Sequence, residues 1–299
     1  MARTADSATV DRVSSTLRRP ALRVDLLDDR DRDDLIELVD ADPLVNVVVS
    51  ARLRALATVE RRRLGGALLG VRDREGRLTG AAFSGGNLLP IGGGADEWQA
   101  LAQHVAGAPR VCTSIVGRAA AVGAMWEALA SVWGPARAIR AQQPLLMLDR
   151  TGPLERHDPR VRPIRADELE QYLPAAAAMF TEELGISPYV ASGAGDYRRR
   201  TAGLIRERRA FGIVENGEVI FKADLGAVSA QTCQVQGVWV RPDLRGRGIG
   251  TAALSVVLRH ALTLAPTVSL YVNDFNFAAR RVYDRLGLRQ AAVLSTVLF

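Results

Sequence analysis

Residues that commonly bind metal ions are scarce in this chain. Its 299 residues include two cysteines and three histidines, and their positions do not follow the spacing of metal-ligand motifs. We therefore expect no metal site. Cys112 and Cys233 are expected to serve in packing, and the histidines to lie in the core or on the surface.

Long apolar runs are also missing. No hydrophobic stretch approaches the ~20 residues that span a bilayer. The first twenty residues are polar and lack the hydrophobic segment of a secretory signal peptide. These absences predict a cytoplasmic protein without a membrane partner, and a flexible tail over residues 1–20.

Lysine is almost absent, although the chain is basic. Lys222 is the only lysine, so the formal net charge of +6 and the pI near 10.0 come from arginine. Arginine runs at residues 61–63 and 198–200 are typical of nucleic-acid binding. Acidic residues are also numerous, however, with five aspartates between positions 28 and 34. We therefore expect these arginines to form a solvated surface and expect no nucleic-acid partner.

Glycine and arginine are concentrated in one loop of the second half. Residues 237–240 are apolar and predict a strand, and the apolar spacing of residues 254–261 predicts a helix. Between them lie Gly246, Gly248 and Gly250. The first turn of a helix leaves backbone N–H groups without partners and carries partial positive charge. Because glycine has no Cβ to block access to those groups, the loop predicts a pyrophosphate-binding site.

The spacing of this loop separates it from two common phosphate-binding motifs. A dinucleotide-binding G-x-G-x-x-G counted from Gly246 would place Thr251 at the third glycine. A P-loop would need a lysine after its last glycine, and Lys222 lies upstream of the loop. The pattern Arg245-x-x-Gly248-x-Gly250 instead resembles the acetyl-CoA signature of the GNAT superfamily of N-acetyltransferases.

A second motif supports this resemblance. Residues 268–272 predict a short buried strand, followed by Asn276 as the N-cap of a helix that Gly287 ends. Asn276, Ala279, Tyr283 and Gly287 match the superfamily pattern N-x-x-A-x-x-x-Y-x-x-x-G. Upstream, the Asn-Gly pair at residues 216–217 between apolar runs predicts a hairpin. The resemblance spans residues 161–299 and implies a catalytic GNAT domain of the α/β (α+β) class.

The first half repeats the same order of predicted elements. A strand, a helical segment, a hairpin around residues 74–76, a strand at 111–116 and a helix at 119–132 follow one another. No R-x-x-G-x-G occurs there, so residues 21–148 resemble a degenerate GNAT-like domain without cofactor binding. Residues 149–160 are polar and rich in proline and glycine, which is typical of an interdomain linker.

The whole chain therefore resembles a tandem GNAT, an arrangement similar to that of mycothiol synthase. The fold implied is two GNAT-like domains, each with a mixed, mostly antiparallel twisted sheet flanked by helices. The expected work of the first domain is to cover the catalytic domain and to shape one wall of the acceptor cleft.

The resemblance implies acetyl-CoA as the cosubstrate and assigns its contacts. Backbone groups of Val238, Trp239 and Val240 would hold the pantetheine arm, and N–H groups of Arg245, Gly246, Arg247, Gly248, Ile249, Gly250 and Thr251 the pyrophosphate. Asn276 and Ala279 of the second motif complete the implied cofactor-binding set. An amine would attack the thioester directly in a ternary complex. The fold implied has a strand splayed from its neighbour, and one of its unpaired backbone N–H groups would stabilise the oxyanion.

Tyr283 is the candidate general acid. A phenol stays protonated at neutral pH and can donate its proton to the departing thiolate. The alternative is a packing role, because residues 279, 282, 283 and 286 form the apolar stripe of their helix.

The general base is less clearly marked. Some relatives carry a Glu where this chain has Gln234, and others where it has Tyr271. Glu182 and Glu183 lie in the segment that usually lines the acceptor site, where an exposed helix surface is the alternative. A water held by Gln234 or Gln236 is a further candidate.

These features are compatible with three functions. The leading one is acetyl-CoA-dependent N-acetyl transfer to a small-molecule amine or to a peptide or protein amine. A CoA-sensing or regulatory protein without transfer activity is the alternative, and a nucleic-acid-associated factor comes third. The sequence makes no prediction of the acceptor's identity or of the oligomeric state.

Overall fold

The structure is a computed structural model that describes residues 22–149, 154, 156–191 and 193–299. The tail expected at residues 1–20 lies outside this part of the chain, as do residues 150–153 and 155 of the expected linker. Within the described ranges, no helix has the length and hydropathy needed to cross a membrane.

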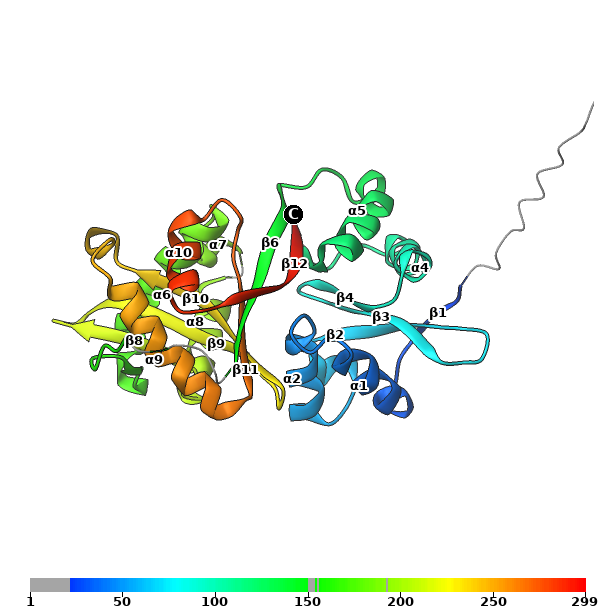
Figure 1. Cartoon of the computed structure of the whole chain (residues 1–299). Helices are drawn as coiled ribbons and strands as arrows, with labels where there is room; N and C mark the ends of the chain where they lie inside the picture. The colour runs from blue at the N-terminus through cyan, green and yellow to red at the C-terminus, as the bar shows by residue number, and fades with distance from the viewer. Residues whose placement is uncertain (1–21, 150–153, 155, 192) are drawn as a thin grey trace, which may run out of the picture.

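The first half runs from strand β1 to strand β6, and its strands and helices alternate along the chain (Figure 1). Its elements are β1 (Val24–Leu26), η1 (Asp29–Asp31), α1 (Arg32–Asp40), α2 (Val47–Leu56), α3 (Arg61–Leu64), β2 (Gly66–Arg72), β3 (Leu78–Gly85), β4 (Leu88–Gly92), α4 (Ala95–Ala106), β5 (Ser114–Arg118), α5 (Ala119–Trp133) and β6 (Ala138–Asp149).

The second half repeats this order. Its elements are β7 (Arg162–Pro163), η2 (Ala166–Glu168), α6 (Leu169–Leu184), α7 (Pro188–Ala191), α8 (Ala194–Arg206), β8 (Ala210–Glu215), β9 (Glu218–Val228), β10 (Thr232–Val240), η3 (Pro242–Leu244), α9 (Ile249–Leu264), β11 (Thr267–Tyr271), α10 (Phe277–Arg285) and β12 (Arg289–Leu298). Asn216 and Gly217 both have positive φ, 51° and 79°. Positive φ at both turn residues is what a type I′ hairpin requires, so the hairpin predicted there is confirmed.

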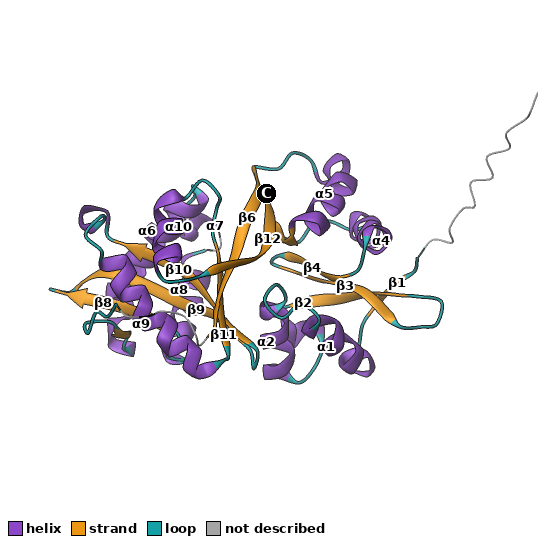
Figure 2. Ribbon diagram, in the orientation of Figure 1, coloured by secondary structure: helices purple, strands orange, loops and turns teal. Residues whose placement is uncertain are grey.

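The fold class predicted from the sequence is confirmed. Strand pairs are antiparallel except for β4 with β5 and β10 with β11, and helices flank the strands in both halves (Figure 2). The described strands form one sheet of twelve in the order β1-β2-β3-β4-β5-β12-β6-β11-β10-β9-β8-β7. The two halves therefore share a single continuous sheet.

The last strand of each half pairs with strands of the other half. The C-terminal strand β12 lies between β5 and β6, pairing Thr296 with Val116 of β5. Strand β6 lies between β12 and β11 and pairs Leu146 with Leu270 of β11. In Figure 1 the two strands run side by side at the centre of the molecule. The boundary expected at residues 149–160 thus separates β6 in sequence from the strands with which it pairs.

The exchanged strands also supply core residues. Leu146 and Leu148 of β6 belong to the cluster that packs under α9 in the second half. Val297 of β12 belongs to the cluster formed with α4 and α5 in the first half. Cys112 and Cys233 are buried free thiols in these two cores.

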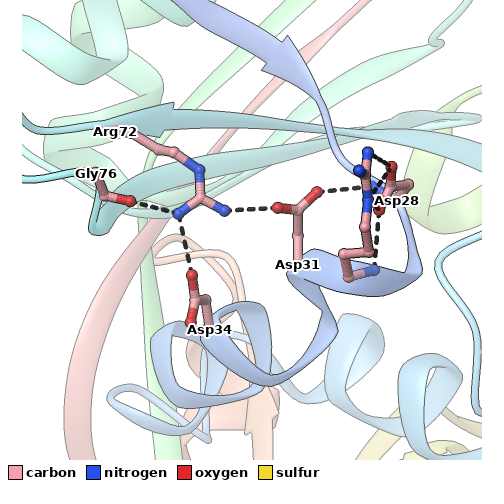
Figure 3. Close-up of polar contacts among 6 residues, drawn as sticks. Asp28, Asp31, Asp34, Arg72 and Gly76 are labelled. Carbon is pink, nitrogen blue, oxygen red and sulfur yellow. Dashed lines mark hydrogen bonds and ion pairs between the residues drawn. The ribbon is translucent and has the colours of Figure 1, made fainter.

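The aspartate run of the first half is paired locally. The Arg72 guanidinium donates to Asp31 Oδ1 at 2.6 Å, to Asp34 Oδ2 at 3.0 Å and to the Gly76 carbonyl at 2.6 Å (Figure 3). Asp31 also accepts from the backbone N–H of Asp28 at 2.8 Å. These contacts fasten η1 and α1 to β2, so the acidic run has a structural function.

The Arg162–Glu168 pair fastens the start of the second half in a similar way. Both Glu168 oxygens accept from the Arg162 guanidinium at 2.7 Å, and one accepts from the Arg165 N–H at 2.9 Å. The hydrogen bonds from Arg162, the largest cause, lower the pKa of Glu168 from 4.5 to about 2.

We expect Glu168→Gln to destabilise the protein at pH 7 by roughly 1–3 kcal/mol, because hydrogen bonds to a charged group are lost. A lowered folded-state pKa stabilises the fold above the unfolded value, and this contribution disappears as the pH falls through the folded value. The difference in the free energy of unfolding between wild type and variant should therefore shrink between pH 4.5 and 2. Urea denaturation across this range measures it, and a gap independent of pH would contradict the assignment.

Candidate functional site

Strands β10 and β11 separate halfway along their length. Their parallel pairing joins residues 232, 233 and 234 to residues 267, 268 and 269. From Val235 to Val240, β10 has no partner on that side among the described residues. Its backbone groups there lack a strand partner and can pair with an extended ligand, as in strand addition, except that the Val240 carbonyl already accepts from the Arg245 guanidinium. Val238, Trp239 and Val240, predicted to hold the pantetheine arm, lie on this open edge.

The same part of β10 carries a bulge toward β9. Gln236 is paired with Asp224, but the next pair is Trp239 with Lys222, so Gly237 and Val238 together face one residue of β9. Gly237 has φ of 61°, a conformation that favours glycine. A bulge turns backbone groups out of the regular ladder, and this one does so where β10 leaves β11.

The loop between β10 and α9 leaves the helix N-terminus open. Gly246 and Gly248 have φ of 77° and 83°, and a Cβ on either would meet no atom within 4 Å. The first helical hydrogen bond runs from the Ala252 N–H to the Gly248 carbonyl at 3.2 Å. Within the described residues no side chain caps this end. Backbone N–H groups of the loop and first turn are thus available to an anion.

In the first half, the N-terminus of the corresponding helix, α4, is occupied by a side chain of the protein. Strand β4 ends at Gly92 and α4 begins at Ala95. The Glu97 carboxylate accepts from the Gly94 N–H at 3.0 Å, and the Trp98 indole donates to the Gly92 carbonyl at 2.8 Å. An acidic side chain therefore occupies the position that an anion would take.

The arginines of the loop have partners within the protein. Arg245 donates to the Val240 carbonyl at 2.9 Å and to Glu182 Oε2 at 2.7 Å, and Arg247 donates to the Asp243 carbonyl at 3.1 Å. Glu182 also accepts from the Trp239 indole at 2.9 Å. The Glu182 carboxylate thus connects α6 to both β10 and the loop. These contacts favour a structural role over that of a base.

Glu183, the next residue of α6, lies near two tyrosines. Burial is the largest cause of a raised pKa at Tyr283, and the negative charge of Glu183 adds to it. The same two causes raise the pKa of Tyr271 to about 12, against a lowering effect of Arg140. The Arg140 guanidinium lies 3.7 Å from the Glu183 carboxylate and also donates to the Glu183 carbonyl. The structure therefore places Glu183 beside Arg140 and within electrostatic range of Tyr271 and Tyr283.

Tyr283 lies in α10 and is buried in the main core of the second half. The residue is 6% exposed. Because burial raises its pKa, the phenol stays protonated throughout the neutral range. Asn276 begins this helix, since its side chain accepts from the Ala279 N–H at 3.1 Å. In the structure, Asn276 and Ala279 thus make the N-cap that positions Tyr283.

Gln234 lies at the last paired position before β10 and β11 separate. It is 7% exposed and faces Ser269 of β11 and Ala227 of β9. Gln236 is exposed and covers Gly226, where a Cβ would lie 2.3 Å from the glutamine side chain.

Two parts of this region were not predicted from the sequence. Arg140 belongs to β6, about 40 residues before Glu183, in the strand that the second half receives from the first. Lys222, Asp224 and Tyr172 form a buried polar group beside the bulge. A single lysine inside the apolar run 219–223 was the available signal, because a buried charge in a strand needs partners. Among the described residues, no His, Cys, Asp and Glu cluster is arranged to hold a metal ion.

Comparisons with known proteins agree with this geometry. Residues 176–288 match the model of the acetyltransferase (GNAT) family, and residues 66–172 match a domain of unknown function, DUF4081. A tandem GNAT protein from the clavulanic acid biosynthesis pathway aligns with 93% of this chain and 98% of its own, with a TM-score of 0.51 and 18% identity. At that identity the likeness concerns the fold.

Two curated relatives share shorter segments. The chain is 47% identical over 58 residues to mycothiol acetyltransferase of Streptomyces scabiei, which is 19% of each protein. It is 36% identical over 55 residues to the peptidyl-lysine N-acetyltransferase YjaB of Salmonella typhimurium, which is 18% of this chain and 35% of the relative. The matched segments thus span about a fifth and about a third of these relatives' lengths.

Proposed function

We propose, from the premise that residues 176–288 are a GNAT acetyltransferase domain, that the chain transfers an acetyl group from acetyl-CoA to an amine. The observation that supports this most is the open edge of β10 next to the uncapped N-terminus of α9. A thioester with a long polar arm and a pyrophosphate suits a free strand edge followed by free N–H groups. The second half has both features, whereas Glu97 closes the corresponding helix of the first half.

The residues proposed to hold acetyl-CoA are those that the sequence predicted. Backbone groups of Val238, Trp239 and Val240 would bind the pantetheine arm, and N–H groups from Arg245 to Thr251 the pyrophosphate. Gly246 and Gly248 leave open space in front of these groups, which fits a phosphate. Arg245 and Arg247 would contribute through their backbones, because their side chains have partners in the protein.

The proposed reaction is a direct transfer. The amine lone pair attacks the thioester carbonyl, a C–N bond forms, the C–S bond breaks, and the thiolate leaves. Tyr283 donates the proton that the thiolate takes up. Of the predicted bases, the contacts favour Glu183 over Glu182, because the Glu182 carboxylate is held by Trp239 and Arg245. A water at Gln234 would be the alternative acceptor of the amine proton.

The proposed acceptor is a primary amine. The two curated relatives are named mycothiol acetyltransferase and peptidyl-lysine N-acetyltransferase. A small-molecule amine and a lysine side chain are therefore the two classes to assay first, by the release of free thiol from acetyl-CoA. A CoA-sensing protein would bind acetyl-CoA and release no thiol with either class.

We expect Tyr283→Phe to lower kcat about 10²-fold while the affinity for acetyl-CoA changes little. The phenylalanine ring keeps the packing of the buried tyrosine, and the donor proton is lost. Thiol release gives kcat, and calorimetry with CoA gives the affinity. A variant with wild-type kcat, under conditions where chemistry limits the rate, would return Tyr283 to a packing role.

A further inference from the structure

The only lysine of the chain is completely buried beside the β10 bulge. Lys222 has 0% exposure, and its ammonium donates to Asp224 Oδ2 at 2.7 Å and to the Gly237 carbonyl at 3.0 Å. The Tyr172 hydroxyl donates to the other oxygen of Asp224 at 2.5 Å. Tyr172 comes from α6, Lys222 and Asp224 from β9, and Gly237 from β10. The network therefore joins three elements at one point.

The buried Lys222–Asp224 ion pair is not explained by stability alone. Removing two charges from water is costly, and replacing a buried ion pair by apolar side chains is often neutral or stabilising. Lys222 is also fitted closely, because a Cβ on Gly237 would lie 2.8 Å from its nitrogen. The planar fork of an arginine is larger than this compact ammonium. The only lysine of the chain thus lies where a compact cation is needed to contact the Gly237 carbonyl in the β10 bulge.

The contact with Gly237 fixes the orientation of the next backbone donor. In a planar trans peptide, the carbonyl of one residue and the N–H of the next point in opposite directions. Since the Gly237 carbonyl is directed to Lys222, the Val238 N–H is directed away from Lys222 and β9. On that other side β10 has left β11. Burial, followed by the charge of Asp224, raises the pKa of Tyr172, so the phenol remains a donor that holds Asp224 in place.

We infer that Lys222, Asp224 and Tyr172 are positioning residues for acetyl transfer. They hold the Gly237–Val238 peptide so that its N–H receives the thioester oxygen as negative charge develops there. This inference rests on the proposed function. It predicts that disturbing the network lowers kcat more than it lowers the affinity for CoA, because an oxyanion donor acts mainly in the transition state.

The main test is the double variant Lys222→Met/Asp224→Asn, which removes both charges together and keeps an acceptor for Tyr172. We expect kcat, measured as thiol release from acetyl-CoA with an amine that the wild type acetylates, to fall about 10²-fold. The calorimetric Kd for CoA should stay within about threefold, since the pyrophosphate loop is untouched. Tyr172→Phe, which removes one hydrogen bond and keeps the ring, should lower kcat by a smaller factor in the same direction.

Glu168→Gln is the matched control. It breaks another buried carboxylate pair, in the same half but at β7 and η2, away from β10. It should lower the melting temperature and leave kcat within about twofold of the wild type. The inference is overturned if the double variant, or Tyr172→Phe where the double variant does not fold, keeps wild-type kcat. It is also overturned if kcat and CoA affinity fall together. A wild type that binds no acetyl-CoA overturns the proposed function itself.

Discussion

A fragment of residues 150–299 is expected not to fold on its own. It contains β7 to β12 but lacks β6, the strand that lies between β11 and β12. Without β5 and β6, β12 loses both of its partners, and one edge of β11 is exposed. Leu145, Leu146 and Leu148, all buried, are removed as well. At about 2 kcal/mol for each buried leucine, this loss is a large part of the roughly 5–15 kcal/mol by which a domain is stable.

The measurement is cooperative thermal unfolding of purified fragments, followed by far-UV circular dichroism and calorimetry with acetyl-CoA. A second fragment, residues 135–299, restores β6 and should recover part of the structure, although β12 still lacks β5. Coexpression of residues 1–134 with residues 135–299 should recover the rest, since every strand pair is then available. A 150–299 fragment that unfolds cooperatively and binds acetyl-CoA as the full chain does would contradict this prediction.

The strand exchange is the part of the fold that the sequence could not predict. The order of elements was readable, because helices and turns depend on nearby residues such as Asn216 and Asn276. The partner of a strand is not encoded in its own alternation of apolar and polar residues. Residues 138–149 would look the same whether they paired within the first half or with β11, so the sequence alone places β6 with its neighbours in the chain.

In the candidate site, too, local motifs could be predicted from the sequence, whereas contacts between distant residues could not. The pyrophosphate loop, the N-cap at Asn276 and the position of Tyr283 follow from short motifs. The contacts of Glu182, Arg140 and Lys222 join residues separated by 15 to 63 positions. The sequence pattern allowed Glu182 as a base because it does not show which groups hold the Glu182 carboxylate. Those groups, the Trp239 indole and the Arg245 guanidinium, come from a distant part of the chain. Such contacts depend on tertiary packing.

The second large effect is expected at the pyrophosphate loop, where Gly248→Asp should abolish acetyl-CoA binding. Gly248 is the N-cap residue of α9, with φ of 83° and open space around the position of a Cβ. Aspartate tolerates positive φ better than most residues. At an N-cap its carboxylate accepts from the first N–H groups of the helix. The variant would thus close α9 as Glu97 closes α4, and would add a negative charge where the pyrophosphate binds.

This mechanism separates stability from binding. Because the new carboxylate caps an open helix, the melting temperature of Gly248→Asp should stay near that of the wild type, apart from the modest strain of a side chain at positive φ. Calorimetry with acetyl-CoA should show an affinity reduced by more than about 10²-fold, since charge repulsion and occupied N–H groups act together.

Gly248→Asn provides the control for charge. Asparagine can cap the same N–H groups and adopts the same backbone conformation, but it carries no charge. It should therefore weaken binding less than Gly248→Asp does, and the difference should shrink as salt screens the repulsion. If folded Gly248→Asp binds acetyl-CoA with nearly the wild-type affinity, the pyrophosphate cannot lie at the N-terminus of α9, and the open edge of β10 would have to hold the cofactor without it.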